Sequence, residues 1–214
     1  MISIFYSNST EIKEKTSLND LLQKLPKSME ERALRYKFAQ DAFNFVLGRL
    51  LLKKGLETLG LPAQKLEDLY YNEEEKPLLE GISFSITHSQ DLVACAFAAK
   101  GNLGLDLECA RILNRKHFRH CFNEEEWSNI SSDESLDTFY WYWTAKEAIL
   151  KANGVGLGRL MDIKIKDKQS ALFFTGEHAS SWRLKNIDFG RRDAYACLCM
   201  EQDVDIKLKR ISYF

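Results

Sequence analysis

Two eight-residue stretches far apart in the chain echo one another: "DLVACAFA" at 91–98 and "DAYACLCM" at 193–200. Each begins with aspartate, carries Ala-Cys at the same offset and follows a stretch with a helical pattern. Two unrelated buried strands could produce so short a likeness. As a repeat, it predicts two similar α+β halves, 1–105 and 106–214, in a pseudo-twofold arrangement with an active site in the cleft between them.

The hydrophobic pattern on either side of these stretches is that of an α+β protein. One long helix is expected over 30–59, and a mostly helical stretch over 124–153 should stop at Asn153-Gly154. Strands are expected at 1–7, 82–86, 92–98, 103–108, 162–165, 171–175, 194–200 and 205–208. With three prolines and no Gly/Ser-rich tract, the sequence shows no obvious flexible linker.

Composition excludes several classes of protein. The 214 residues are 45% apolar with a net charge of −1, which gives no overall attraction to nucleic acid or membrane. No apolar run approaches the roughly 18 residues of a membrane span, and the N-terminus lacks a signal-peptide pattern. Five cysteines without paired spacing fit reduced thiols. We therefore expect a cytoplasmic protein.

The stretch "GLDLE" at 104–108 alternates strictly, so Asp106 and Glu108 should share one face of a strand. The commoner explanation for such a pair is a solvated outer face. The alternative is a site for a hard cation, because Mg²⁺ prefers oxygen ligands and is usually held by one or two carboxylates plus substrate phosphates. Two acids alone do not decide between these explanations.

The stretch "WTAKEAILKANGVGLG" at 143–158 adds a third carboxylate. On a helix, Glu147 and Lys151 lie at i and i+4, with Lys146 beside them, and a surface ion pair would be worth about 0.2–0.5 kcal/mol. Aromatic residues crowd the preceding turns, which indicates a largely buried helix. Since unpartnered buried charges cost several kcal/mol, a metal for Glu147 and a phosphate for the lysines explain them better than solvent does.

Taken in order, "FSITHS" (84–89), "GLDLE" and "WTAKEAILKANGVGL" (143–157) resemble the 4′-phosphopantetheinyl transferases of the long, surfactin-synthetase-activating type. Lys76-Pro77 and "F-x-x-E-E-W" at 122–127 are similar to that family as well. Each motif is weak alone, whereas the ordered set from about residue 30 to 160 is specific. The resemblance implies two similar halves and transfer of the phosphopantetheine arm of coenzyme A to a serine of an apo acyl or peptidyl carrier protein.

The resemblance also implies roles for individual residues. Asp106, Glu108 and Glu147 would hold Mg²⁺ on the coenzyme A diphosphate, with Glu147 also the best candidate for the general base. Lys146 and Lys151 would contact the phosphates, and Lys151 would stabilise the leaving adenosine 3′,5′-bisphosphate. The remaining coenzyme A contacts would come from Lys76, Pro77, Thr87, His88 and Ser89, and from Arg32, Arg35 and Arg49 on the first helix.

Some of these assignments compete with structural explanations. A lone histidine such as His88 is more often a structural hydrogen-bonder, Lys76 could be a plain surface lysine, and a solvated helix face accounts equally well for each arginine. The chain also departs from the family pattern. Glycine often precedes Lys-Pro in the family, where this chain has Glu75, and serine commonly precedes the histidine, where it has Thr87.

Two other functions remain open at this point: a non-catalytic module that binds coenzyme A or a carrier protein, and a Mg²⁺-dependent hydrolase of a nucleotide diphosphate. A degenerate binding module should have lost one of the three acids, and all three are present. Because both halves of the cleft would lie in one chain, we expect a functional monomer. The sequence does not identify the carrier protein served.

Overall fold

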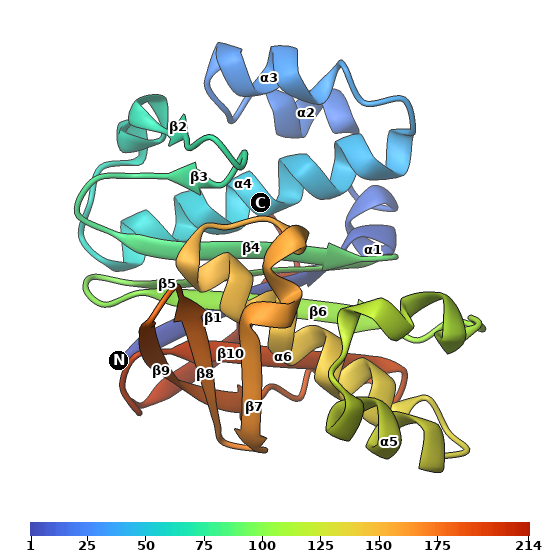
Figure 1. Cartoon of the computed structure of the whole chain (residues 1–214). Coiled ribbons are helices and arrows are strands. Elements are labelled where there is room, and N and C mark those ends of the chain that lie inside the picture. Colours follow the sequence, from blue (N-terminus) through green and yellow to red (C-terminus); the bar gives the residue numbers. More distant parts are fainter. The chain divides into compact units, whose positions relative to one another are not determined.

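The computed structural model describes residues 1–214, which form two compact units (Figure 1). Unit 1 consists of Met1–Lys100 and Val204–Phe214, and unit 2 of Gly101–Asp203. This division differs from the expected boundary between residues 105 and 106. The difference arises because the last strand, β11 (Ile206–Arg210), pairs in parallel with the first, β1 (Ile2–Asn8), so that the end of the chain completes unit 1.

The core of unit 1 lies between one sheet and one long helix. The sheet has the order β11-β1-β5-β4, in which β4 (Ser83–Ser89) and β5 (Leu92–Ala98) form the predicted antiparallel strand pair. Helix α4 (Ala39–Thr58) packs against β5, β4 and β1 (Figure 1). The smaller elements are α1 (Ser9–Lys13), α2 (Leu18–Leu22), α3 (Lys27–Ala33), the 3₁₀ helix η1 (Ala63–Asp68), β2 (Tyr70–Tyr71) and β3 (Pro77–Leu78).

The single helix expected over 30–59 is wrong, because the structure has two helices there. Helix α3 ends at Ala33 and α4 begins at Ala39, after Phe38 in an extended conformation (φ −107°, ψ 131°). Leu34 and Phe38 belonged to the apolar stripe that suggested one helix, but their residues are 64% and 61% exposed. They bury too little surface to hold the chain helical across 34–38.

Unit 2 is built on an antiparallel sheet of order β6-β10-β9-β8-β7, and helix α6 (Asp137–Asn153) packs against β6 and β10. The predicted stop is confirmed, since Gly154 caps α6 in the left-handed conformation (φ 68°). The strands are β6 (Leu103–Cys109), β7 (Ile163–Asp167), β8 (Ser170–Thr175), β9 (His178–Asn186) and β10 (Ala194–Met200). The other helices are η2 (Arg115–Cys121), α5 (Glu124–Ser132) and η3 (Leu157–Asp162).

Helices and strands together confirm the α+β class, and no helix is long and apolar enough to cross a bilayer. Strand β9 was not predicted. Its first four residues are all exposed, and only Trp182 and Leu184 in its second half face the core. A strand without alternation over half its length gives no period-2 signal to detect.

The two echoing stretches occupy matching places in two antiparallel strand pairs, β1 with β5 and β6 with β10. In each pair, the backbone carbonyl of the leading aspartate accepts a 2.6 Å hydrogen bond from the residue after the partner strand: Ser9 to Asp91 and Ala110 to Asp193. The registers are therefore equivalent. They pair Phe5 with Cys95 and Ser7 with Val93 in unit 1, and Asp106 with Cys197 and Glu108 with Tyr195 in unit 2.

Candidate active site

The predicted acids of unit 2 lie where a strand and a helix approach unusually closely. Gly104, Asp106 and Glu108 alternate onto one face of β6. A Cβ at Gly104 would stand 1.9 Å from the carbonyl oxygen of Ala148 and 2.5 Å from the amide nitrogen of Ala152, both in α6. Only glycine permits this approach, which brings the acidic face of β6 against the C-terminal half of α6.

Three carboxylates and a lysine interact electrostatically at this junction. Lys151 donates from Nζ to Oδ1 of the buried Asp106 at 2.5 Å. Burial, followed by the charges of Asp106 and Glu108, raises the pKa of Glu147 to about 7, although Lys151 opposes the shift. Burial disfavours the charge on Lys151 itself, but Asp106 and Glu147 outweigh it and raise its pKa. We call Asp106, Glu108 and Glu147 the acid set.

The donor chemistry of the acid set fits a hard divalent cation. Its members offer only carboxylate oxygens, and burial, followed by the negative charge of Asp106, raises the pKa of Glu147. No three acidic, histidine or cysteine side chains of the chain are gathered into a ready-made metal cage. In proteins generally, a magnesium ion is held by one or two carboxylates together with waters and substrate phosphates.

Lys146, predicted to contact phosphate, points elsewhere. Its Nζ lies 2.7 Å from Oε2 of Glu126 and donates to the backbone carbonyls of Cys121 (3.0 Å) and Leu160 (3.2 Å). The Lys146 residue is 1% exposed, and burial lowers its pKa despite the opposing effect of Glu126. With its ammonium enclosed by these acceptors, Lys146 is a structural residue here, and we remove it from the expected phosphate contacts.

Glu126, the partner of Lys146, was not predicted as a functional residue. It forms a capping box at the start of α5, accepting from the Asn123 amide at 3.0 Å while its own amide donates to Asn123 Oδ1 at 2.9 Å. The sequence signal was the spacing Asn-x-x-Glu. The Glu126 carboxylate therefore fixes both the start of α5 and the buried lysine that precedes Glu147.

In unit 1, two of the three predicted arginines meet at one tyrosine. The Arg32 guanidinium lies over the Tyr71 ring, 4.1 Å from its centroid, and Arg49 donates to the Tyr71 hydroxyl at 3.2 Å. Arg35 is exposed and joins neither contact. Tyr71 was not predicted, because nothing in its sequence neighbourhood shows that two distant helices supply arginines to it. We call Arg32, Arg49 and Tyr71 the Tyr71 cluster.

The predicted Lys76-Pro77 lies directly beside this cluster, since Pro77 pairs with Tyr71 across the short β2–β3 ladder. Asn72 ties the loop, accepting from the Lys76 amide through Oδ1 at 2.8 Å. Glu75 adopts φ 59°, a left-handed conformation that favours glycine, and its carboxylate accepts from Arg32 at 2.8 Å. The departure from the family's glycine thus falls where the backbone conformation favours glycine.

The other predicted coenzyme A residues of unit 1 occupy the last three positions of β4. Thr87 is buried, Ser89 is half-buried and His88 is exposed, so the alternation of the strand separates the histidine from its neighbours. His88 lies in the edge strand β4, which extends three residues beyond the strand expected at 82–86. Its exposure leaves the imidazole on the surface of unit 1.

Comparison with known proteins assigns the chain to a family. A family model described as the 4′-phosphopantetheinyl transferase superfamily matches residues 102–199, the interval that holds the acid set. The 4′-phosphopantetheinyl transferase HetI of Nostoc sp. is 32% identical over 163 residues, covering 70% of this chain and 68% of the relative. The mouse L-aminoadipate-semialdehyde dehydrogenase-phosphopantetheinyl transferase is 31% identical over 190 residues, covering 72% and 60%.

A third relative, the 4′-phosphopantetheinyl transferase gsp of Aneurinibacillus migulanus, is 31% identical over 144 residues, covering 65% of this chain and 60% of the relative. The chain therefore spans between 60% and 68% of the length of these three curated relatives. On the identity and coverage shared with the Nostoc protein, and on the family match across the acid set, the chain belongs to the 4′-phosphopantetheinyl transferase superfamily.

Proposed function

We propose that this protein transfers the 4′-phosphopantetheine arm of coenzyme A to a serine hydroxyl of an apo acyl or peptidyl carrier protein, releasing adenosine 3′,5′-bisphosphate. The observation that carries the proposal is the junction of the buried Asp106 with the half-buried Glu147 and Lys151, held by the close approach at Gly104. The names of the relatives support the same reaction. All three members of the acid set are retained, which favours catalysis over binding alone.

The acid set would hold Mg²⁺, which would neutralise charge on the coenzyme A diphosphate. In the transfer itself, the serine Oγ forms a bond to the phosphorus attached to pantetheine, and the bond from that phosphorus to the bisphosphate oxygen breaks. The electron pair leaves with the bisphosphate, where the Lys151 ammonium stabilises the developing charge. We assign the proton released by serine to Glu147, one helical turn from Lys151.

Binding of coenzyme A is assigned to unit 1. The Tyr71 cluster and Lys76 bring three cationic side chains to one short hairpin, a composition suited to phosphate groups. Pro77, Thr87, His88 and Ser89 stay in this proposal through the family resemblance, and Arg35 remains a further candidate through its exposure. We also propose that a monomer, located in the cytoplasm, is the active form.

The carrier protein is expected to be acidic around its modified serine. Residues 22–60 carry eight Lys/Arg against four acids, which offers the complementary charge. Because exposed charges are screened over about 8 Å at physiological ionic strength, the KM for carrier protein should rise with salt. A KM that stays constant from low to high salt would contradict this docking surface.

The decisive experiment measures transfer of the arm by mass spectrometry of an apo carrier incubated with the protein, coenzyme A and Mg²⁺. Glu147→Gln should lower turnover by at least about 100-fold, because a general base typically contributes 10²–10⁴-fold. Glu134→Gln, an exposed change of the same chemistry, is the matched control and should transfer at the wild-type rate. Near wild-type transfer by Glu147→Gln would refute the assignment, and bisphosphate release without any carrier would indicate a hydrolase.

A further inference from the structure

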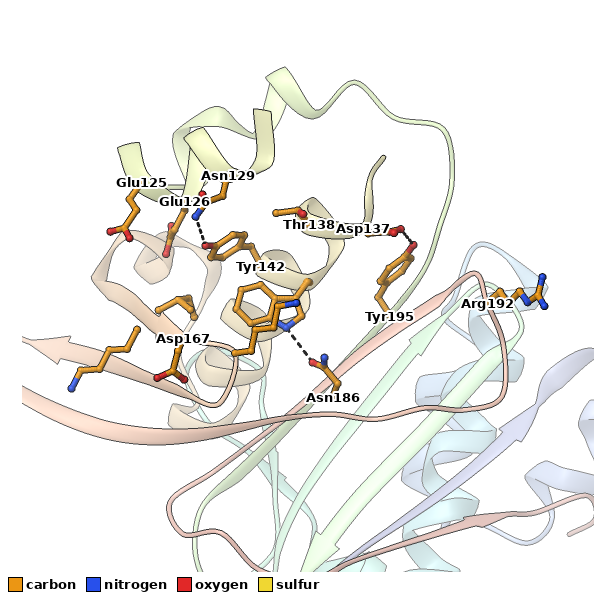
Figure 2. A pocket seen from close by; sticks show the side chains of 14 residues that line it. Glu125, Glu126, Asn129, Asp137, Thr138, Tyr142, Asp167, Asn186, Arg192 and Tyr195 are labelled. Carbon is orange, nitrogen blue, oxygen red and sulfur yellow. Dashed lines mark hydrogen bonds between the residues drawn. The ribbon is translucent and has the colours of Figure 1, made fainter. Parts of the chain in front are cut away.

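A second concave site lies wholly within unit 2, apart from the acid set. It is a cavity of about 620 Å³ bordered by α5, the start of α6 and the ends of β7 and β9 (Figure 2). The α6 residues that line it come from the first two turns, 137–142, whereas Glu147 and Lys151 lie in the last two. We call this space the α5–α6 cavity.

The cavity presents a fixed aromatic surface. Trp141 and Tyr142 meet edge to face with ring centroids 4.6 Å apart. The Trp141 indole donates from Nε1 to Asn186 Oδ1 at 3.1 Å, and the Tyr142 hydroxyl accepts from Asn129 Nδ2 at 3.0 Å (Figure 2). Trp141 is half-buried, so part of its ring remains open to a ligand, and it also lines an adjoining cavity of about 210 Å³.

The same wall carries negative charge that the protein compensates incompletely. Glu126 is 2% exposed; one carboxylate oxygen pairs with Lys146, but the other, Oε1, is buried without a hydrogen-bond partner. The exposed Glu125 extends from the same helix and takes part in no ion pair (Figure 2). Burial raises the pKa of the Tyr142 hydroxyl, and Glu126 and Glu125 raise it further, so their field reaches the aromatic surface.

The basic residues at the rim do not compensate this charge. Lys166 and Lys168 are exposed and form no ion pair with Glu125, and the Arg192 side chain points away from the other lining residues in Figure 2. Burying a carboxylate oxygen without a hydrogen-bond partner costs free energy. A cation that donates a hydrogen bond to this oxygen would offset that cost. Cations are also attracted to the face of tryptophan more strongly than to other rings.

We propose that the α5–α6 cavity binds a small organic cation, an alkylammonium or alkylguanidinium, with its charged head at Glu125 and Glu126 and against the Trp141 ring. This site is separate from the transfer chemistry and does not depend on the proposed function. The cationic head could belong to a free metabolite or to an arginine or lysine side chain of another protein, since both share this chemistry.

Agmatine, which carries both cationic groups on a four-carbon stem, is the direct probe. Titration calorimetry with the whole protein should show saturable binding of one agmatine per chain, and butyrate, a smaller linear molecule of opposite charge, should not bind. Glu125→Gln should weaken binding about fivefold and Trp141→Leu about tenfold. Glu134→Gln, exposed and outside the cavity, is the matched control. Tighter binding of a blocked arginine tripeptide than of agmatine would assign the head group to a protein partner.

Nuclear magnetic resonance locates the site independently of any activity. The indole N–H signal that disappears in Trp141→Leu should be the one that shifts on adding agmatine, among the four tryptophans of the chain. The proposal fails if agmatine does not saturate by about 10 mM, which would leave a hydrated cavity. It also fails if Glu134→Gln weakens binding as much as Glu125→Gln, or if inorganic phosphate binds at Lys166 and Lys168 in preference to the cation.

Discussion

The strand pairs β1–β5 and β6–β10 share one register yet carry opposite chemistry. The position opposite the cysteine is Phe5 in unit 1, packed edge-on against Phe97 with ring centroids 4.9 Å apart, and Asp106 in unit 2, paired with Lys151. Both positions are almost completely buried. The comparison teaches that the same backbone pairing accepts either a hydrophobic core or a charged site, and that the residues facing the helix decide which.

The long helices α4 and α6 also differ in the partners of their buried cations. In α4 the buried cation Arg49 contacts neutral groups, the Phe45 ring and the Tyr71 hydroxyl. In α6 the buried cation Lys146 faces the carboxylate of Glu126. Unit 2 thus concentrates paired charges inside its core, and unit 1 keeps its cationic groups against aromatic rings.

The largest difference in unfolding free energy is expected when the buried cation of each helix, Lys146 or Arg49, is replaced. Lys146→Met leaves Glu126 as an uncompensated buried charge and should lower the free energy of unfolding by about 3–5 kcal/mol. Arg49→Met leaves only neutral partners and should cost about 1–2 kcal/mol. Urea denaturation measures both. The double variant Lys146→Met/Glu126→Leu should regain much of the loss, and equal costs for the two single variants would remove the distinction between the helices.

The next largest difference in stability is expected between equivalent positions of β6 and β1. Gly104→Ala drives a Cβ into the α6 backbone, so we expect a loss of about 1–3 kcal/mol or more, with reduced transfer activity as α6 shifts away from Asp106. The equivalent position in β1 is Ser3, which already carries a side chain, and Ser3→Ala should cost less than about 1 kcal/mol. Gly158→Ala is the control, because a Cβ added at Gly158 would have no neighbouring atom within 4 Å. A tolerated Gly104→Ala would show that the close approach is dispensable.

One left-handed backbone position in each unit carries a different kind of residue. Unit 1 places Glu75 at φ 59°, and unit 2 places Gly176 at φ 60° in the β8–β9 turn. Glu75→Gly should stabilise by about 0.5–1 kcal/mol, because the exposed ion pair with Arg32 contributes little. Gly176→Ala should destabilise by about 1 kcal/mol. Thermal melting resolves both, and a lower melting temperature for Glu75→Gly would mean that the Arg32 contact outweighs the strain.

The smallest expected difference is in how the stability of each helix start depends on pH. The N-cap residues of α4 and α6 both lack a side-chain cap hydrogen bond, but Asp133 fixes the start of α6 by accepting from the Thr138 amide at 3.0 Å and the Ser135 hydroxyl at 2.8 Å. Hydrogen bonds from Thr138 and then Ser135 lower the pKa of Asp133. Its stabilising contribution is therefore complete above about pH 4 and is lost as pH falls toward the lowered value.

Asp133→Asn should accordingly melt below the wild type at pH 7, and the difference should narrow at about pH 3. Asp203→Asn, an exposed aspartate outside the helices and strands, is the control and should show no such trend. A melting difference that stays constant across this range would exclude the carboxylate's charge as the cause.

The parts of the fold that sequence could predict are those with a local signal. The hairpin at 82–98 and the stop at Gly154 depend on alternation and on one glycine, and both are present. The break at 34–38 could not be predicted, because Leu34 and Phe38 continue the helical spacing but find no core to bury against. Whether an apolar side chain is covered depends on segments distant in sequence.

The same limit applies to the site. The spacing of Glu147 and Lys151 predicted that they share one face of a helix, and the structure brings both of them to Asp106. The sequence could not predict which group the Lys146 ammonium contacts, because its partner Glu126 belongs to a separate helix. Gly104 was quoted within its motif, yet its role appears only when α6, more than forty residues later, lies against it.

The parallel pairing of β11 with β1 has a consequence for synthesis on the ribosome. Unit 2 is one uninterrupted segment, and all of its strands have been made before residues 204–214 are translated. Unit 1 must wait for those residues, because its sheet pairs residues 2–6 with residues 206–210. During translation β1 would have one unpaired edge while unit 2 is already complete, so the nascent chain is most open to aggregation or proteolysis along β1.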